Sequence, residues 1–485
     1  MLHVNRGTIL RVPTKIGQIA QELSKINPWW RETNWTELDY DLRDAAASGI
    51  SYNSTVLADL RPKCLYVLRG PRRTGKTVAV KQKIRELIAA GVPPRSIVLI
   101  AADGWEARDL RTLVQNTALP QLPAGQNRYW FIDEISAVTG AWDKQIKWLR
   151  DNDLSFRDST VVLTGSNAAS LTAAAGTLAG RRGDELGLDR TLFPIGFRTF
   201  ANLLSRRTQS ILPVLPLTGL RTQTARNAYQ ELIPWLDELV RLWEMYLTYG
   251  GFPTSVAAAA QGVPEPLNLV EDLFQVVSAD IFKASQLASH TEMALLERLW
   301  SSMASPVNLS KIGGEINVSY EVVGRHIGYL RDAFLLWQCP QRDEKRWAPR
   351  KRAPTKLYAI DPLIARLPHL RNSSSPDVDP TALTEMQVGL AIIRRAYAEG
   401  TAITNDQFLF HFKTPSRREI DFISECLAGV ALEAKYCEGG KWNGDAATVN
   451  ASAWDGILVT RNVLDTNSNS AWAVPAGILC YLLDT

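Results

Sequence analysis

The chain has 485 residues and a formal net charge of +4, with 46% hydrophobic and 21% charged residues. These values are typical of a soluble protein with well-formed cores, and the length suggests about three domains. They exclude a disordered chain and a polycation, so any surface for nucleic acid must come from local clusters of basic residues.

The sequence gives no indication of a membrane protein or a secreted protein. No apolar run reaches the roughly 18 residues that a membrane helix needs, and the first residues, MLHVNRGTILRVPTK, lack the continuous apolar segment of a signal peptide. The scattered cysteines form no CxxC pair, which favours free buried thiols in a reducing compartment over structural zinc. We therefore expect a cytoplasmic protein with no membrane partner.

The clearest motif is GPRRTGKT, which follows a short apolar strand at 64–68 and precedes a helical pattern. Its GxxxxGK[ST] spacing between strand and helix is that of a P-loop, whose backbone N–H groups surround the phosphates of a nucleotide. We expect Lys76 to reach the β- and γ-phosphates of ATP and the Thr77 hydroxyl to hold Mg²⁺. The residues predicted to bind the cofactor here are Gly70, Pro71, Arg72, Arg73, Thr74, Gly75, Lys76 and Thr77.

An acidic pair follows a second apolar strand. The segment RYWFIDEIS (128–136) ends its strand with Asp133 and Glu134. We expect Asp133 to hold Mg²⁺ and Glu134 to polarise the attacking water as the catalytic base or orienting group. An ordinary acidic turn is the alternative, but the pair lies at the distance downstream of the P-loop that an ATPase requires.

Two further segments could complete the nucleotide site. The strand STVVLTGSN (159–167) ends in Ser166 and Asn167, either of which could sense the γ-phosphate. The loop LAGRRGD (178–184) offers Arg181 and Arg182 as an arginine finger, as loop anchors, or as solvated surface residues. Strands and helices alternate over 60–200, which predicts a parallel sheet in a three-layer α/β domain.

These motifs together resemble a prokaryotic family of AAA+ ATPases. The resemblance rests on GPRRTGKT, WFIDEI, LTGSNA, LAGR and LFPIGFRTF, and it continues through YLTYGGFP (246–253) and KLYAIDPLIA (356–365). It implies that Asn167 is the sensor and Arg181 the finger. The fold it implies is an α/β P-loop AAA+ domain followed by a helical lid, a winged-helix region and a restriction-endonuclease-like α/β domain. The corresponding ranges are 1–58 for a lead-in, 59–205, 206–290, 291–372 and 380–485.

The region around residue 320 predicts DNA binding. Residues 291–340 read as helix, short helix, turn and helix, with Ser319 as the N-cap of a recognition helix from Tyr320. The following segment, 341–356, would be the wing, and it is the most basic stretch of the chain. We expect phosphate contacts there, while a protein-docking surface between domains is the competing interpretation. The basic residues are Arg342, Lys345, Arg346, Arg350, Lys351, Arg352 and Lys356.

The C-terminal region predicts a metal site. A helix carries Glu385 near its start, and the string REIDFISECLAGVALEAK (418–435) places Asp421 on one strand and Glu433 and Lys435 on one face of the next. Two carboxylates can hold Mg²⁺, and a neighbouring lysine can orient a water, which is the chemistry of a nuclease. The string resembles the PD-(D/E)xK nucleases, which implies catalytic Asp421, Glu433, Lys435 and Glu385, with Asp421 and Glu433 as metal ligands.

The same residues allow a second interpretation. Acids and lysine could form a mutual ion-pair cluster in a domain that retains its fold without activity. Two functions therefore remain. The first is an ATP-hydrolysing AAA+ protein that acts on DNA and carries a Mg²⁺-dependent nuclease-like domain. The alternative is a nucleotide-dependent switch whose C-terminal domain is an inactive module for binding nucleic acid or protein. A finger acting in trans would require a homo-oligomer.

Overall fold

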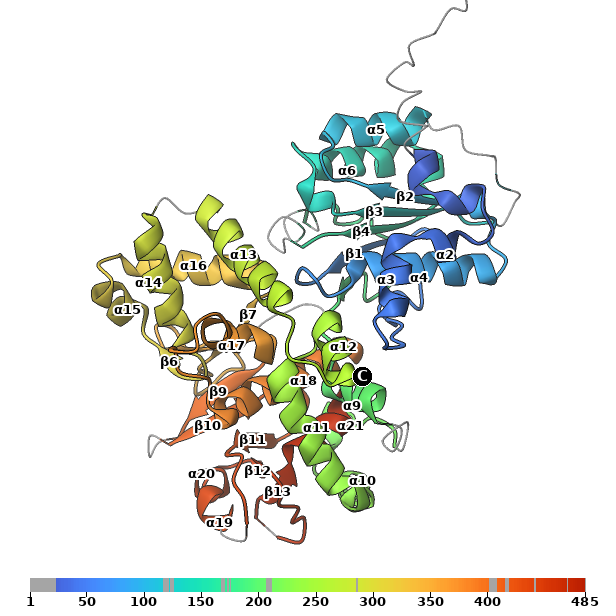
Figure 1. Cartoon of the computed structure of the whole chain (residues 1–485). Helices are drawn as coiled ribbons and strands as arrows, with labels where there is room; N and C mark the ends of the chain where they lie inside the picture. Colours follow the sequence, from blue (N-terminus) through green and yellow to red (C-terminus); the bar gives the residue numbers. More distant parts are fainter. Residues whose placement is uncertain are drawn as a thin grey trace, which may run out of the picture.

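The structure is a computed structural model that describes residues 23–116, 122, 126–166, 171, 174, 176–205, 212–284, 287–400, 408–414, 418–439, 442–468 and 470–484. Figure 1 shows an N-terminal body, coloured blue to cyan, and a larger C-terminal body, coloured green to red. None of the helices in these described ranges combines the length and apolarity needed to cross a bilayer.

The N-terminal body is a three-layer α/β sandwich, as the alternating pattern predicts. Its five strands run in parallel in the order β2-β3-β4-β1-β5. Helices cover both faces of this sheet (Figure 1), so strands β1 to β4 are apolar along most of their length, whereas the short edge strand β5 is polar. The strands are β1 (Leu65–Arg69), β2 (Ile97–Ala101), β3 (Tyr129–Asp133), β4 (Thr160–Thr164) and β5 (Asp189–Thr191).

Two hydrophobic clusters lie on the two faces of this sheet, because successive strand residues point to opposite sides. The helices on one face are α2 (Trp35–Leu38), α3 (Tyr40–Ala47) and α4 (Lys76–Ala89). Those on the other are α5 (Ala107–Asn116), α6 (Trp142–Asn152) and α7 (Leu154–Arg157). The predicted lead-in belongs to this body: the indoles of Trp29 and Trp30 both donate to the carbonyl oxygen of Ile97.

The C-terminal body contains two sheets and most of the helices. A five-stranded mixed sheet has the order β13-β12-β11-β10-β9, in which β9, β10 and β11 are antiparallel and β11, β12 and β13 are parallel. An antiparallel three-stranded sheet has the order β6-β8-β7. The strands are β6 (Pro306–Val307), β7 (Leu336–Pro340), β8 (Thr355–Ala359), β9 (Phe410–Lys413), β10 (Glu419–Ile423), β11 (Val430–Ala434), β12 (Asp455–Thr460) and β13 (Trp472–Pro475).

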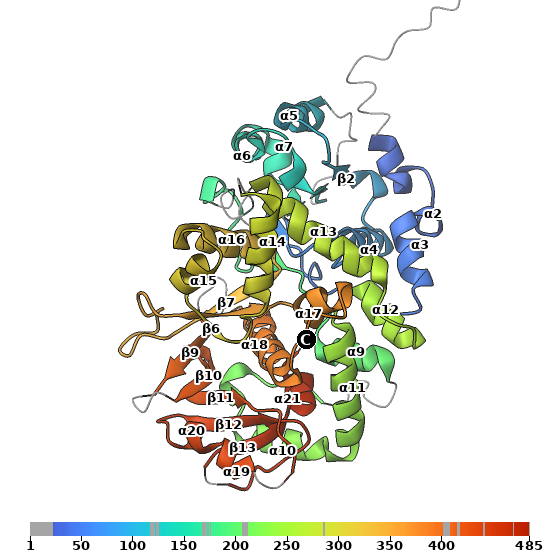
Figure 2. The same cartoon turned by 60° about the vertical axis from the view of Figure 1, so that its left-hand side comes forward.

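The helices of this body pack around both sheets (Figure 2). They are α9 (Phe197–Leu204), α10 (Gln223–Glu231), α11 (Leu236–Tyr249), α12 (Pro253–Gln261), α13 (Leu267–Ala284), α14 (Ser289–Trp300), α15 (Leu309–Glu315), α16 (Tyr320–Asp332), α17 (Pro362–Arg371), α18 (Pro380–Ala398), α19 (Trp442–Asp445), α20 (Ala447–Asn450) and α21 (Ala476–Leu483). A single hydrophobic cluster extends from Ile195 to Leu483, so the regions predicted as lid, winged helix and nuclease-like domain share one core.

Segments that carry the family resemblance meet at one buried junction in this core. Asp361, from KLYAIDPLIA, accepts hydrogen bonds from the backbone N–H groups of Gly251 (2.7 Å) and Leu363 (2.9 Å). The Tyr246 hydroxyl donates to the carbonyl oxygen of Ile195 (3.1 Å). A Cβ on Gly251 would lie 2.1 Å from that same oxygen, so the GG of YLTYGGFP is required by close backbone approach. These motifs therefore hold the fold together.

The end of the chain belongs to the same junction. Asp484, directly after α21, accepts from the backbone N–H of Phe197 (2.7 Å) and pairs through both oxygens with the guanidinium of Arg394 (2.6 and 2.9 Å). This ion pair is buried, and its two oriented hydrogen bonds offset part of the cost of burying the charges, although the Nη1 atom of Arg394 has no hydrogen-bond partner. The last helix is thereby tied to the segment that leaves the N-terminal body.

Candidate functional site

The P-loop connects β1 to α4, and two of its glycines are required by the backbone. Gly75 has φ +88°, a left-handed conformation, at the N-cap of α4. A Cβ on Gly70 would lie 2.3 Å from the carbonyl oxygen of Leu192, which precludes any side chain. The loop therefore takes a conformation that only this glycine spacing allows, and it presents the start of α4 to the neighbouring cavity.

Lys76 folds back over the loop. Its ammonium group donates to the carbonyl oxygens of Gly70 (2.9 Å) and Pro71 (2.8 Å), and its side chain is buried. Burial lowers the pKa of Lys76 to about 8, although the negative charges of Glu134 and Asp133 oppose this shift. A buried ammonium group held only by neutral carbonyls is poorly compensated, so an anionic phosphate would be a favourable partner.

Asp133 links the P-loop to two strands. The Thr77 hydroxyl donates to its Oδ2 atom (2.7 Å), and the Thr164 hydroxyl donates to its Oδ1 atom. The sheet order explains this meeting, since β3 and β1 both lie beside β4 and all three strands end at the same edge. The Thr77 hydroxyl and the Asp133 carboxylate are hard oxygen ligands of the kind that Mg²⁺ prefers.

Glu134 lies one residue beyond the end of β3 in a left-handed conformation, with φ +51°. Its backbone N–H donates to the Thr164 hydroxyl (3.1 Å), and its Oε2 atom accepts from the Ser166 hydroxyl (3.2 Å). Left-handed backbone is uncommon for a glutamate and is held here by these neighbours. Sequence reasoning missed Thr164, which contacts both acids; the signal was its position at the end of the adjacent strand.

The remaining predicted nucleotide residues divide into two groups. Asn167 lies outside the described residues. Arg181 pairs with Asp151 (2.6 Å), while Arg182 pairs with Asp189 (2.8 Å) and donates to the carbonyl oxygen of Leu65 (3.3 Å). Leu65 begins β1, whereas the P-loop follows the other end of that strand. Arg181 therefore lies at the opposite edge of the sheet from its own P-loop and does not reach the nucleotide site of its own chain.

A cavity of about 780 Å³ adjoins the P-loop. Its lining includes Lys76, Thr77 and Glu134 from the N-terminal body and Ala257 and Ala258 from α12 of the C-terminal body. The volume is in the range of small-molecule and cofactor sites. A nucleotide bound there would contact both bodies at once.

Two polar contacts join the bodies beside this cavity. Arg73 of the P-loop pairs with Asp272 of α13 (2.6 Å), and the amide of Gln261 on α12 donates to the carbonyl oxygen of Ser48 (2.9 Å). In Figure 2, α12 and α13 lie on the side of the C-terminal body that faces α3 and α4. The cavity walls therefore depend on how the two bodies are held together.

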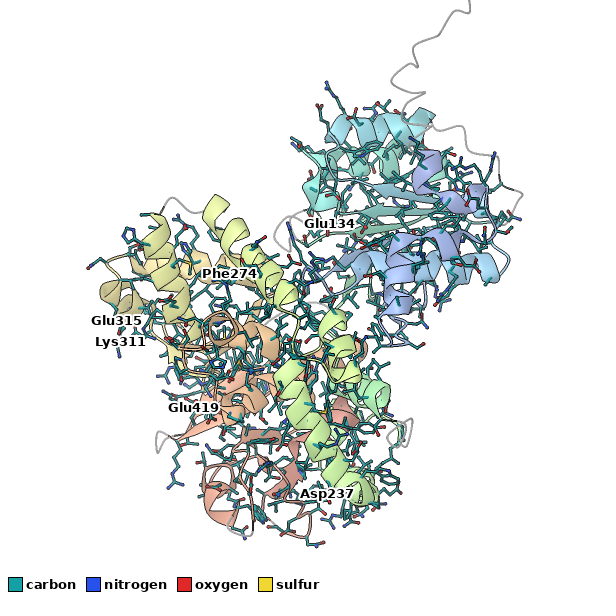
Figure 3. All side chains as sticks on the ribbon, in the orientation of Figure 1. Glu134, Asp237, Phe274, Lys311, Glu315 and Glu419 are labelled. Atoms are coloured by element: carbon teal, nitrogen blue, oxygen red, sulfur yellow. The ribbon has the colours of Figure 1, made fainter. Side chains whose placement is uncertain are left out.

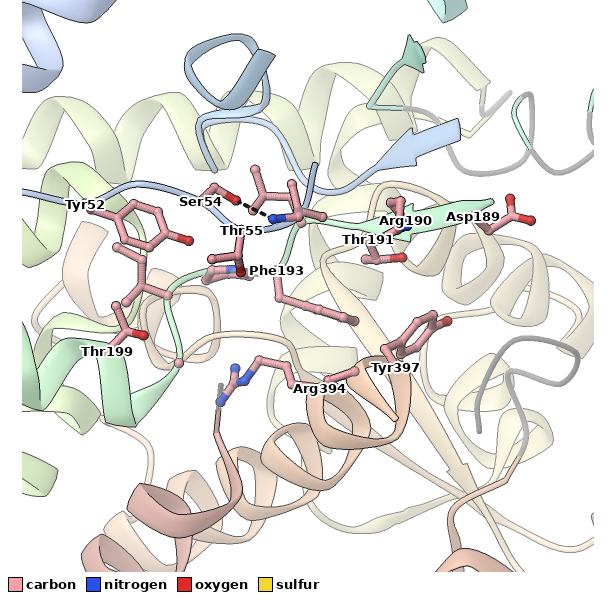
Figure 4. A pocket seen from close by; sticks show the side chains of 16 residues that line it. Tyr52, Ser54, Thr55, Asp189, Arg190, Thr191, Phe193, Thr199, Arg394 and Tyr397 are labelled. Carbon is pink, nitrogen blue, oxygen red and sulfur yellow. Dashed lines mark hydrogen bonds between the residues drawn. The ribbon is translucent and has the colours of Figure 1, made fainter. Parts of the chain in front are cut away.

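Figure 3 places Glu134 in the N-terminal body and Glu419 in the C-terminal body, so the nucleotide cavity and the acidic residues of the C-terminal sheet are separate sites. A smaller cavity of about 230 Å³ lies between the bodies (Figure 4). Arg190 lines it from β5, Phe193 from the segment that follows β5, and Arg394 and Tyr397 from α18. Tyr52 lines both this cavity and the nucleotide cavity.

The C-terminal acids converge, as the predicted hairpin requires. Strands β10 and β11 are antiparallel, with Phe422 opposite Leu432, so Asp421 lies beside Glu433. The backbone N–H of Ala434 donates to the Asp421 Oδ2 atom (2.9 Å).

The cation at their centre is Lys356. This residue belongs to β8, and its ammonium group lies 2.7 Å from Glu385, 2.7 Å from Glu419 and 2.8 Å from Asp421. Its side chain is only 3% exposed. We call Lys356, Glu385, Glu419, Asp421 and Glu433 the acidic cluster. The prediction that Lys356 contacts DNA phosphate is wrong, because the residue is buried among these carboxylates.

The charges of the acidic cluster are strongly coupled. Burial would lower the pKa of Lys356, but the carboxylates of Asp421, Glu385 and Glu419 raise it well above its usual value. Burial raises the pKa of Glu385 to about 7, Asp421 adds to this increase, and Lys356 opposes it. Tyr358 also donates to Glu385 (2.5 Å). The ammonium group is thus charged and fully paired at neutral pH.

Glu433 of β11 pairs with Lys435, which directly follows the strand (2.9 Å), and Lys435 is 42% exposed. Burial raises the pKa of Glu433, with Lys435 opposing and Asp421 reinforcing the shift. Within the described ranges, no group of three or more His, Cys, Asp and Glu residues is arranged to hold a metal ion. Glu385 and Asp421 instead share the ammonium group of Lys356.

The predicted wing is a hairpin between β7 and β8, closed by pairing of Arg342 with Pro349. Arg342 stacks on the Trp347 ring, 4.2 Å from its centroid, and Arg350 pairs with Glu344 (3.3 Å). Part of the predicted basic surface is therefore engaged within the hairpin. The basic side chains that remain exposed there are Lys345, Arg346, Arg350, Lys351 and Arg352.

Among solved structures, similar chains include the Walker-type ATPase PABY2304 of Pyrococcus abyssi, with 13% identity over 63% of this chain and 91% of that one and a TM-score of 0.36. The ORC2 protein of Aeropyrum pernix shows 12% identity over 76% and 96%, with a TM-score of 0.34. A RuvB variant of Thermotoga maritima shows 15% identity over 64% and 90%, with a TM-score of 0.25. These scores are too low to support a functional comparison.

Family models match two parts of the chain, whereas no curated protein matches it. Residues 240–375 match a model described as a domain of unknown function, DUF8612. Residues 63–201 match a model described as an AAA domain. That match covers the P-loop, the acidic pair and the parallel sheet, and it identifies residues 63–201 as a P-loop AAA+ domain, the nucleotide-binding unit of an ATPase.

Proposed function

We propose that this protein binds and hydrolyses ATP and acts on DNA as a nucleotide-dependent switch. The observation that carries this proposal is the cavity beside the P-loop, which Lys76, Thr77 and Glu134 line from one body and α12 lines from the other. Because both bodies form the walls, binding and loss of the γ-phosphate can change how the bodies are held.

The chemistry follows from residues at the edge of the sheet. Thr77 and Asp133 would hold the Mg²⁺ that accompanies ATP, and this ion supplies positive charge at the transferred phosphoryl group. Lys76 is positioned to leave its carbonyl partners and bind phosphate oxygens. Glu134, fixed by Thr164 and Ser166, would orient the attacking water.

DNA is the proposed partner because of the order and shape of the elements from α14 to β8. The succession α14, β6, α15, α16, β7 and β8, with an antiparallel sheet and an exposed basic hairpin, is typical of winged-helix domains. Exposed lysines and arginines at the tip of the hairpin suit phosphate contacts without reading base sequence.

The C-terminal module has two candidate roles. The position of Lys356 favours an inactive interaction module, because the shared cation of Glu385 and Asp421 is already an ammonium group. The convergence of Glu385, Asp421 and Glu433 beside a mixed sheet favours a Mg²⁺-dependent nuclease as the second candidate. We place the switch with an inactive interaction module first, because the chain itself supplies the cation that the acidic residues share.

The switch is tested by measuring DNA binding in different nucleotide states. Glu134→Gln should bind ATP but lose turnover by roughly 10²–10⁴-fold, which traps the ATP state. With this variant, fluorescence anisotropy should show different DNA affinities with ATP and with ADP. Equal affinities in all nucleotide states would refute the switch.

The DNA surface is tested by charge reversal. The double variant Lys345→Glu/Lys351→Glu should weaken binding to all DNA sequences alike and reduce its salt dependence. Lys144→Glu, an exposed change on α6 of the other body, is the matched control and should leave binding unchanged. A salt-independent affinity, or equal loss in the control, would favour protein docking at the hairpin.

The second candidate has its own test. Incubation of DNA with the protein, Mg²⁺ and ATP should yield cleavage only if the C-terminal module is a nuclease, and Asp421→Asn should then abolish cleavage without affecting ATP turnover.

Arg181 would complete a nucleotide site only in trans, so mass measurement with and without ATP tests for a homo-oligomer.

A further inference from the structure

We propose that the cavity of about 230 Å³ between the two bodies binds a small oxyanion, inorganic phosphate, at the guanidinium of Arg394 and the first turn of α9. The site is separate from the P-loop, and it goes beyond the proposed function because it requires neither ATP hydrolysis nor DNA. Arg394 lines the cavity from α18, Thr199 from α9 and Thr191 from β5 (Figure 4).

Arg394 has an unused hydrogen-bond donor at the wall of this cavity. Its side chain is only 7% exposed, and its Nε and Nη2 atoms donate to the two oxygens of Asp484, whereas its Nη1 atom is buried with no partner. Buried polar groups in proteins are nearly always paired, and a guanidinium has more N–H donors than one carboxylate accepts in this arrangement. The edge of Arg394 that carries Nη1 is therefore left for a second oxyanion.

The first turn of α9 lies beside this guanidinium. The Oδ2 atom of Asp484 accepts from Arg394 and also from the backbone N–H of Phe197, the first residue of α9 (2.7 Å). The next two N–H groups, of Arg198 and Thr199, have no carbonyl partner within the helix. Because Thr199 lines the cavity, the positive end of α9 borders it and favours a negatively charged ligand.

A second unpartnered polar atom belongs to the wall that the other body forms. The hydroxyl of Thr191 on β5 is buried and has no hydrogen-bond partner. A hydroxyl can donate to a phosphate oxygen or to a water bound to it. An oxyanion in the cavity would therefore have polar groups from both bodies around it, since Arg394 belongs to α18 and Thr191 to β5.

The charges of the lining favour an anion over a cation. Two basic residues, Arg190 and Arg394, line the cavity together with one acid, Asp189. Asp189 is itself paired with Arg182 (2.8 Å). The partner of Arg190 is Asp59 (3.0 Å), whose side chain is 64% exposed, so water weakens its negative field.

The size and position of the cavity indicate which anion fits. Its volume exceeds what one water needs and lies below the roughly 300–1,000 Å³ of larger ligand sites, so it suits an ion such as phosphate rather than a nucleotide. Tyr52, Ser54 and Leu192 line both this cavity and the nucleotide cavity. Phosphate is also the oxyanion that ATP hydrolysis would form on the other side of this shared wall.

The experiment measures binding of inorganic phosphate to the full chain by calorimetry at constant ionic strength. A Lys76→Met background removes the main side-chain cation of the P-loop, so the remaining binding reports the cavity, and about one phosphate should bind per chain. Replacing Arg394 would leave Asp484 unpaired, so the test uses Thr199 instead. Thr199→Asp adds a negative charge at the cavity while suiting the first turn of a helix, and it should weaken phosphate binding at least about tenfold.

The matched control is Thr224→Asp, which makes the same change at an exposed position in the first turn of α10, outside the cavity lining. It should bind phosphate as the Lys76→Met parent does. The inference is overturned if the parent binds no phosphate at millimolar concentrations, or if Thr199→Asp binds phosphate as tightly as Thr224→Asp.

A second measurement identifies the source of the phosphate. With the P-loop intact, a fluorescent phosphate sensor follows a single turnover of ATP. A lag between hydrolysis and release that shortens in Thr199→Asp means that the cavity receives phosphate formed at the P-loop, whereas the absence of a lag means that it binds phosphate from solution. Both results support the site. A protein that fails to hydrolyse ATP would refute the proposed function and leave the phosphate binding of the Lys76→Met background unaffected.

Discussion

The two bodies of this protein each bury a lysine near carboxylates, yet the two lysines have opposite environments. Lys76 donates to two neutral carbonyls, and burial lowers its pKa to about 8. Lys356 contacts three carboxylates, which raise its pKa despite burial. Lys76 therefore lacks a negatively charged hydrogen-bond partner, as expected of a residue that binds an anionic ligand. Lys356 is paired with all three carboxylates, so these carboxylates cannot bind another cation while the lysine is in place.

The largest difference should appear in catalysis. Lys76→Met should reduce ATP turnover by roughly 10³-fold or more, because the phosphoryl group loses its main side-chain cation. Lys356→Met should leave ATP turnover within a few-fold of the wild type once the protein is folded. A steady-state phosphate-release assay compares both. Unchanged turnover in Lys76→Met would contradict the P-loop assignment.

For stability the order of the two lysines is reversed, and the change at Lys356 should have the larger effect. Lys356→Met leaves the buried carboxylates of Glu385 and Asp421 and the partly buried carboxylate of Glu419 without their cation, and it should lower the free energy of unfolding by about 3–5 kcal/mol. Lys76→Met removes a poorly compensated buried charge and should leave the stability of the nucleotide-free protein unchanged or raised. Urea unfolding at pH 7 measures both. Equal destabilisation by the two changes would mean that their environments do not differ as described.

The lowered pKa of Lys76 predicts a pH dependence of nucleotide affinity. Below about pH 8 the free and bound forms both carry the proton, so affinity should be flat. Between about 8 and the usual lysine value of 10.5, the free form loses the proton that the phosphate-bound form retains, so affinity should fall as pH rises, by up to about tenfold per pH unit. Titration of a fluorescent ATP analogue at pH 7, 8 and 9 tests this, and an arginine at position 76 should remove the trend (Lys76→Arg).

The smallest expected effect concerns the contact between the bodies. Asp272→Asn frees Arg73 from its 2.6 Å ion pair, so that the guanidinium can turn to nucleotide phosphates. Because the pair is partly exposed, its energy is about 0–1 kcal/mol, and affinity should rise by no more than about fivefold. Glu271, at the preceding position, pairs with Arg371 instead, so Glu271→Gln is the matched control. A fall in affinity with Asp272→Asn would argue that this contact supports the closed cavity.

Local spacing was enough to predict much of the nucleotide site. Gly70, Gly75, Lys76 and Thr77 lie within one loop, and their roles depend on backbone geometry that the motif itself requires. The parallel sheet followed from alternating strands and helices, and Asp133 then had to lie near Thr77. Thr164 was missed because its importance depends on which strand lies beside β3, and strand order is set by packing.

The C-terminal region shows where such reasoning fails. The convergence of Asp421 with Glu433 followed from a short hairpin, but the cation at their centre comes from a strand 65 residues earlier than Asp421. In sequence, Lys356 belongs to a basic stretch and suggests DNA contact. Nothing in its local spacing distinguishes it from the exposed lysines of the hairpin.

By itself, therefore, the sequence determined a phosphate-binding loop, an acidic pair at a strand end and a pair of strands rich in carboxylates, because each depends on residues close together in the chain. The tertiary structure decided that LFPIGFRTF, YLTYGGFP and KLYAIDPLIA form a buried junction, and that Lys356 closes the acidic cluster. Both depend on contacts between distant segments, where burial makes an unpaired charge or carbonyl costly and so selects the partner that only the folded chain supplies.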